Sequence, residues 1–91
     1  MAKTLFGLAF SSAAATYLDR MKAGKARAQI AKKAKLLIVD PHPPGCKKLA
    51  GMKHGEEDVW RIRSGDYRIL YVVREIEVVI LDIGNRKDVY R

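Results

Sequence analysis

The sequence predicts a single α+β domain in which a two-helix N-terminal hairpin packs on a mostly antiparallel sheet of about four strands. Three observations predict this class. The chain has 91 residues, enough for one core and too few for two, so we expect the domain to span residues 1–91. Apolar residues recur at helical spacing twice near the N-terminus. Strand-like segments separated by a tight turn fill the C-terminal half.

The N-terminal segments predict a strand followed by two helices. Residues 4–10 contain four large apolar side chains and are predicted to form the first strand. Ser11 or Ser12 can cap a helix that ends at Gly24, whose apolar face comprises Ala14, Tyr17, Leu18 and Met21. A second helix is predicted over residues 25–39, with a buried stripe of Ala26, Ile30, Ala34, Leu37 and Ile38. Pro41 ends it, and residues 40–52 are predicted to form a long loop.

The charge is strongly positive and unevenly distributed. Lys and Arg number 18 against 10 Asp and Glu, for a formal charge of +8, which favours an anionic partner such as nucleic acid. The alternative is that the charge only keeps a small protein soluble. No acidic residue occurs between Asp19 and Asp40, where seven Lys and Arg residues occur. That helical unit is either a binding surface or a solvated helix face.

A β-hairpin is predicted over residues 59–74, with Gly65 and Asp66 as its two turn residues. This turn pairs Ser64 with Tyr67, Arg63 with Arg68, Ile62 with Ile69, Arg61 with Leu70 and Trp60 with Tyr71. One face then collects the apolar Trp60, Ile62, Ile69, Tyr71 and Val73, and the other collects Arg61, Arg63 and Arg68. Because like charges directly opposite each other destabilise a strand pair, the three arginines suggest a phosphate-binding surface. The alternative is that Arg63 and Arg68 form separate ion pairs with Asp66, Asp58 or Glu75.

The remaining features concern the C-terminal strand and the cellular setting. Residues 77–83 predict a central strand ended by Gly84, and residues 85–91 form either a functional or a solvated tail. A lone cysteine, Cys46, and the lack of a Cys/His cluster predict no disulfide, no metal and no small-molecule cofactor. Residues 3–15 only loosely imitate a secretory signal, and no apolar run approaches the ~20 residues that span a bilayer. We therefore expect a cytoplasmic protein with no membrane partner.

Two blocks of sequence resemble a known family. The first runs Trp60-Arg61-Ile62-Arg63-Ser64-Gly65-Asp66-Tyr67-Arg68-Ile69-Leu70-Tyr71, and the second runs Ile83-Gly84-Asn85-Arg86-Lys87-Asp88-Val89-Tyr90. At this spacing they resemble the RelE/ParE superfamily of toxins from type II toxin-antitoxin systems. Lys48-Leu49-Ala50-Gly51, the helical segments and the first strand extend the resemblance over nearly the whole chain. It implies the fold predicted above.

The resemblance also implies a function and a site. RelE-type toxins are ribosome-dependent endoribonucleases (mRNA interferases) that cut messenger RNA, inhibit translation and are neutralised by a cognate antitoxin. ParE-type toxins share the fold but poison DNA gyrase. By similarity, the positions that RelE-type toxins use in RNA cleavage are Arg61, Arg68, Arg86 and Tyr90. We expect the ribosome, messenger RNA and an antitoxin as partners, and the residues expected to contact RNA are Lys47, Lys48, Lys53, His54, Arg63, Lys87 and Arg91.

The chain departs from the family pattern at the expected proton acceptor. Relatives often have lysine where this chain has Val59 or Arg61, and histidine where it has Asn85. Arginine does not readily release its proton. Other groups could act instead, namely Lys53, His54, Lys87 or Tyr90. The alternatives left open are a ParE-like gyrase inhibitor and a non-catalytic relative that only binds an antitoxin or RNA.

Overall fold

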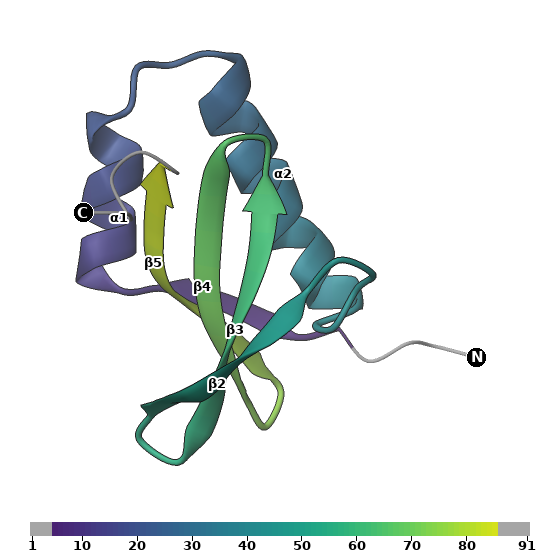
Figure 1. The fold of residues 1–91 in the computed structure, drawn as a ribbon. Coiled ribbons are helices and arrows are strands. Elements are labelled where there is room, and N and C mark those ends of the chain that lie inside the picture. The colour runs from purple at the N-terminus through teal and green to yellow at the C-terminus, as the bar shows by residue number, and fades with distance from the viewer. Residues whose placement is uncertain (1–4, 86–91) are drawn as a thin grey trace.

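The computed structural model describes residues 5–85, which form five strands and two helices (Figure 1). In chain order the elements are β1 (Gly7–Phe10), α1 (Ser12–Arg20), α2 (Lys25–Val39), β2 (Lys47–His54), β3 (Glu57–Ser64), β4 (Tyr67–Arg74) and β5 (Glu77–Asn85). The predicted α+β class is confirmed. Among the described residues, no helix is long and apolar enough to cross a membrane.

The strands form one sheet in the order β1-β5-β4-β3-β2. The β1–β5 pairing is parallel and the other three pairings are antiparallel, so the sheet is mostly antiparallel as predicted. It has five strands rather than about four, because β2 lies largely within residues 40–52, which were predicted to form a loop. This edge strand is almost entirely exposed and lacks apolar alternation. The strand β2 forms because its backbone pairs with β3, and the register of that pairing shifts between Lys48 and Lys53.

Both helices pack on the sheet as predicted, and the predicted helical hairpin differs from the structure in detail, because α1 and α2 cover different sets of strands. α1 contacts β5 and β1, whereas α2 contacts β1, β3, β4 and β5. Figure 1 shows α1 alongside β5 and α2 lying obliquely across the sheet. The bounds of α2 agree with the prediction, while α1 ends at Arg20, before Gly24. Ser11 caps α1 by accepting the N–H of Ala14 at 3.1 Å and donates its hydroxyl to the Leu81 carbonyl oxygen at 2.6 Å.

The core lies between the two helices and one face of the sheet. Its buried members are Ala14, Ile30, Ala34, Leu37, Ile62, Ile69, Tyr71, Val78, Ile80 and Ile83. The β3–β4 register agrees with the prediction in all five pairs. Gly65, the first turn residue, has a φ of 59°, a conformation that favours glycine and that this two-residue turn requires. The apolar face predicted for the hairpin is therefore the face that the helices cover.

An irregularity in β5 decides which of its side chains enter the core. Ile80 lies opposite Tyr71, but the register then shifts, so that Asp82 lies opposite Leu70 and Ile83 lies opposite Ile69. Without the extra residue, Asp82 would lie opposite Ile69 and point toward the helices. The shift buries Ile83 and turns the Asp82 carboxylate to the other face. β5 runs past Gly84 to Asn85, beyond its predicted end, and Asn85 still pairs with Tyr67.

The segment between α2 and β2 is held against the sheet by aromatic side chains. The Tyr71 hydroxyl donates to the Pro41 carbonyl oxygen at 2.7 Å, and burial raises the pKa of that phenol. The rings of His42 and Trp60 lie 4.3 Å apart, tilted by 58°. These contacts position the start of β2 beside β3.

Candidate nucleic-acid interface

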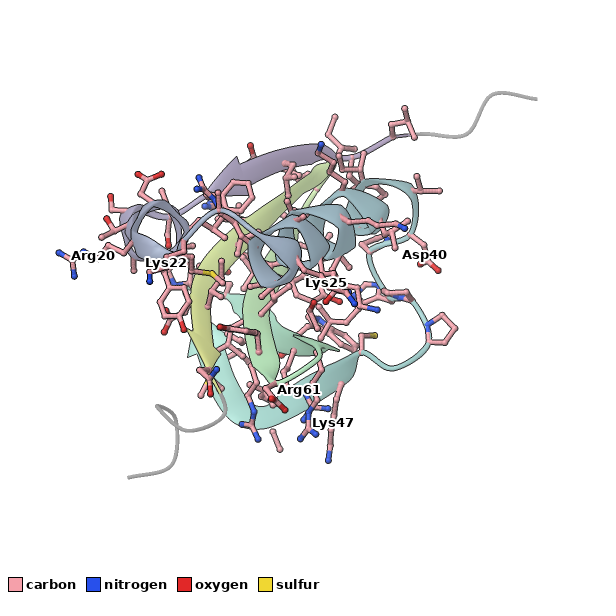
Figure 2. The ribbon with its side chains drawn as sticks, turned by 90° about the horizontal axis from the view of Figure 1, so that it is seen from above. Arg20, Lys22, Lys25, Asp40, Lys47 and Arg61 are labelled. Atoms are coloured by element: carbon pink, nitrogen blue, oxygen red, sulfur yellow. The ribbon has the colours of Figure 1, made fainter. Side chains whose placement is uncertain are left out.

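Four basic side chains lie together on the sheet face that the helices leave uncovered. Lys47 of β2 lies opposite Arg61 of β3, and Arg63 of β3 lies opposite Arg68 of β4. Residues opposite each other share a face, as do residues two apart along a strand. We call this surface the arginine face and define it by Lys47, Arg61, Arg63 and Arg68. Figure 2 shows Lys47 and Arg61 near each other, on the side of the sheet away from α2.

Two arginines of this face have unused binding capacity. Arg61 is half-buried, and its Nε is buried with no hydrogen-bond partner among the described residues. A buried donor without a partner is costly, and a ligand is one of the partners that can satisfy it. Arg63 is exposed, and within residues 5–85 no carboxylate lies within 4.0 Å of it. The arginine face can therefore donate hydrogen bonds to an anion.

Apolar side chains lie beside the cations on the same face. By strand alternation, Val59 shares a face with Arg61, and Val72 shares one with Arg68. They are only 2% and 0% exposed, yet they lie outside the main core cluster. The arginine face thus has a cationic end near the β3–β4 turn and an apolar end farther along the strands. The Arg74–Glu57 ion pair, at 3.5 Å, lies beyond the valines.

The structure separates three of the predicted RNA-contacting residues from the arginine face. Lys48 lies opposite Trp60, so it points toward the helix side of the sheet. The Nζ atoms of Lys48 and Lys53 lie 3.9 Å and 2.7 Å from the Asp58 carboxylate, and the hydrogen bond from Lys53 is the main factor that lowers the pKa of Asp58. His54 lies opposite Glu57, which is six residues from Arg63 along β3, or about 20 Å in an extended strand.

The remaining predicted site residues are Arg86, Lys87, Tyr90 and Arg91, and all of them lie outside the described residues. Asn85, which precedes them, lies opposite Tyr67 on β4. Tyr67 is next in sequence to Arg68 and packs edge-on against Tyr17 of α1, with ring centroids 6.4 Å apart. The last described residue of β5 is therefore next to the cationic end of the arginine face.

Sequence reasoning missed a carboxylate that the structure places beside the arginines on this face. Asp82 lies opposite Leu70, which in turn lies opposite Arg61. Its Oδ1 accepts the N–H of Ile83 at 2.9 Å. The apolar run before Asp82 contains no signal for the β5 irregularity that turns it to this side.

Comparisons with known proteins agree with this architecture. The family model described as "ParE toxin of type II toxin-antitoxin system, parDE" matches residues 8–90. A chain of the archaeal RelE–RelB complex from Pyrococcus horikoshii OT3 is similar in fold, with a TM-score of 0.74 and 23% identity, over 90% of this chain and 96% of that chain. A chain of the RelB–RelE antitoxin–toxin complex from Methanococcus jannaschii has a TM-score of 0.61 and 22% identity, over 90% and 94%. No curated protein sequence matches the chain.

Proposed function

The chain belongs to the ParE toxin family of type II toxin-antitoxin systems, within the RelE/ParE superfamily, and we propose that it is a ribosome-dependent endoribonuclease that cuts messenger RNA in the cytoplasm. The observation that carries the proposal is the arginine face. Arg61, Arg63 and Arg68 lie in register with Lys47 on an uncovered surface, where Arg63 and Arg68 repel each other across the strands. An RNA phosphate can bind there, because within residues 5–85 no carboxylate lies within 4.0 Å of Arg63 and the Nε of Arg61 has no hydrogen-bond partner.

The chemistry assigned to the arginine face is stabilisation of a reacting phosphate. The ribose 2′-oxygen attacks the adjacent phosphorus, the bond to the 5′-oxygen breaks, and negative charge builds on the phosphoryl oxygens in between. Guanidinium groups suit this charge because they stay protonated and present forked donors to phosphate oxygens. We assign phosphate binding to Arg61 and Arg68, and by family similarity a similar role to Arg86 and base stacking to Tyr90.

Proton transfer is assigned to neither Lys53 nor His54. The Nζ of Lys53 lies 2.7 Å from the Asp58 carboxylate. Lys53 and His54 pair with the start of β3, far along the sheet from the cationic end of the arginine face. Lys87 and Tyr90 remain the candidates that the sequence offers. A site in which the ribosome aligns the 2′-oxygen with the phosphorus depends less on acid–base groups, because alignment alone accounts for a large part of such a barrier. This dependence agrees with the proposed requirement for the ribosome.

A cognate antitoxin is the proposed protein partner. The two similar structures are described as complexes of RelE with RelB, and as antitoxin–toxin in one of them. The present chain carries a formal charge of +8, which favours an acidic partner segment. A hollow of about 650 Å³ along α1 suits an amphipathic helix, and it is lined by Ser12, Ala13, Thr16, Tyr17, Arg20 and Met21.

Primer-extension mapping of messenger RNA ends in a reconstituted translation system tests the nuclease. Wild-type protein is expected to produce cuts at ribosome-occupied codons, and Arg68→Gln is expected to remove them. Arg74→Gln is the matched control, because it removes the same charge from the same strand but beyond the arginine face. Intact message with unimpaired translation would refute the proposal, as would equal cutting by Arg68→Gln and the wild type.

The match to the ParE toxin family favours inhibition of DNA gyrase as the second candidate function. By family resemblance, such a toxin traps gyrase on cleaved DNA without cutting nucleic acid itself. A supercoiling assay with purified gyrase separates the two functions. Accumulation of gyrase-linked DNA breaks, together with intact message in the translation assay, would replace the nuclease by the gyrase inhibitor.

A further inference from the structure

A second cationic pocket lies between α2 and the β3–β4 turn, outside the arginine face except for one shared residue. Its volume is about 420 Å³. We call it the α2–turn pocket and define it by Gln29, Lys32, Lys33, Arg63, Ser64 and Gly65, with Leu36 also on its wall. Figure 1 shows the β3–β4 turn beside α2. The pocket is built by elements that are far apart in sequence.

The helical period explains how α2 presents these side chains to the turn. Gln29, Lys33 and Leu36 each come one residue before a member of the buried stripe Ile30, Ala34 and Leu37. A shift of one residue rotates a position by about 100° around the helix, so these residues lie on the flank of α2 next to the core. The tight turn at Gly65 brings Arg63 and Ser64 to that flank.

The charges of the α2–turn pocket have no counter-ion among the described residues. None of its lining residues is acidic. Within residues 5–85, the ion pairs involve Lys48, Lys53 and Arg74, and none involves Lys32, Lys33 or Arg63. Three like charges around one hollow repel each other, and an anion between them would remove that repulsion. The pocket is therefore suited to an anionic ligand.

We propose that the α2–turn pocket binds the phosphodiester backbone of RNA and extends the arginine face around the β3–β4 turn. This inference rests on the proposed RNA-directed function. Arg63 belongs to both sites, and together with Arg68 it also lines a small hollow at the turn. An RNA strand that crosses the arginine face can thus continue along α2. Gln29 and Ser64 provide neutral donors and acceptors suited to ribose hydroxyls.

The lining favours RNA over an acidic protein segment. Among the described residues that line the pocket, Leu36, with 51% of its surface exposed, is the only large apolar side chain. An amphipathic helix would therefore bury little apolar surface here, in contrast to the hollow on α1. Lys and Arg contacts to phosphates need no such surface.

The salt dependence of RNA binding by Lys32→Gln/Lys33→Gln tests the pocket. The probe is a labelled oligouridylate, with affinity measured at several salt concentrations. The slope of log K against log salt concentration is negative, and each lost phosphate contact reduces its magnitude by about 0.7 for a single strand, so the magnitude for the double variant should fall by about 1.4. The matched control Lys22→Gln/Lys35→Gln removes the same charge from exposed positions outside the pocket and should lose less than half as much.

Parallel binding to purified 30S subunits distinguishes messenger from ribosomal RNA. If the salt dependence of Lys32→Gln/Lys33→Gln falls for the 30S subunits and not for the oligouridylate, the pocket is supported and its phosphates are ribosomal. Equal slopes for the pocket and control variants with both probes would overturn the proposal, as would weaker binding of polyglutamate without weaker binding of either RNA. Message cleavage by the same variants is scored separately. If the pocket variant still cleaves message and its salt-dependence slopes are unchanged, the pocket is rejected but the proposed nuclease function is not. Cleavage by Arg68→Gln tests the nuclease function alone.

Discussion

Replacing Arg63 by glutamine is expected to stabilise the fold while weakening RNA binding. Arg63 lies directly opposite Arg68 and shares a pocket with Lys32 and Lys33. Two unit charges about 6 Å apart in water interact by about 0.7 kcal/mol, and salt reduces this value. Loss of the repulsion should therefore raise the free energy of unfolding by about 0.3–0.7 kcal/mol. For a domain of this size, that corresponds to a rise in Tm of about 1–6 °C.

Thermal unfolding followed by circular dichroism measures this change at low and high salt. The gain in Tm should shrink at high salt, because screening already weakens the repulsion in the wild type. Arg74→Gln serves as the control, since it breaks the 3.5 Å pair with Glu57 and should bring no gain. A lower Tm for Arg63→Gln would mean that this arginine has a stabilising partner, and the argument for an anion site would fail. A gain that does not depend on salt would exclude repulsion as its cause.

Three further substitutions test the contacts that position the site. Ser11→Ala removes both the cap of α1 and a 2.6 Å hydrogen bond to the β5 backbone, so the free energy of unfolding in urea should fall by about 1–3 kcal/mol. An unchanged free energy of unfolding would mean that neither hydrogen bond contributes to stability. Tyr71→Phe leaves the Pro41 carbonyl without its donor and should cost about 1–2 kcal/mol by the same method, whereas an unchanged midpoint would show that water replaces the phenol. Lys53→Met should raise the pKa of Asp58, measured by carbon NMR titration, because the hydrogen bond from Lys53 is what chiefly lowers it. The ion pair stabilises the fold above the unfolded pKa of aspartate, and this contribution is lost as pH falls through the lowered pKa of the folded state. A difference in unfolding free energy between variant and wild type that is the same at all pH values would contradict the assignment.

The arginine face was predictable because its geometry is local. Arg61, Arg63 and Arg68 belong to one hairpin, and a two-residue turn at Gly65 and Asp66 determines which residues pair. A slip of one residue would have placed Ile62 beside Arg68 and mixed the two faces. The apolar pattern of the hairpin therefore determines both its register and the direction of its arginines.

The lysines of β2 were less predictable because their positions depend on a partner strand. Residues 47–54 lack the alternation that marks a strand, so nothing local indicates which of Lys47, Lys48 and Lys53 shares a face with Arg61. The pairing with β3 and the irregularity inside β2 determine which way each lysine points. Lys47 lies on the arginine face, whereas Lys53 forms an ion pair with Asp58.

By itself, the sequence determined the class of fold, the bounds of α2, the β3–β4 register and the cationic face of that hairpin, because each follows from periodicity or turn chemistry within a short stretch. Only the tertiary structure decided that α2 lies beside the β3–β4 turn, which brings Lys32 and Lys33 to Arg63. It also decided that Asp82 points away from the core, since the shift in β5 lets Ile83 fill the space against Ile69. Both outcomes depend on how distant segments pack against each other, and no local pattern encodes that packing.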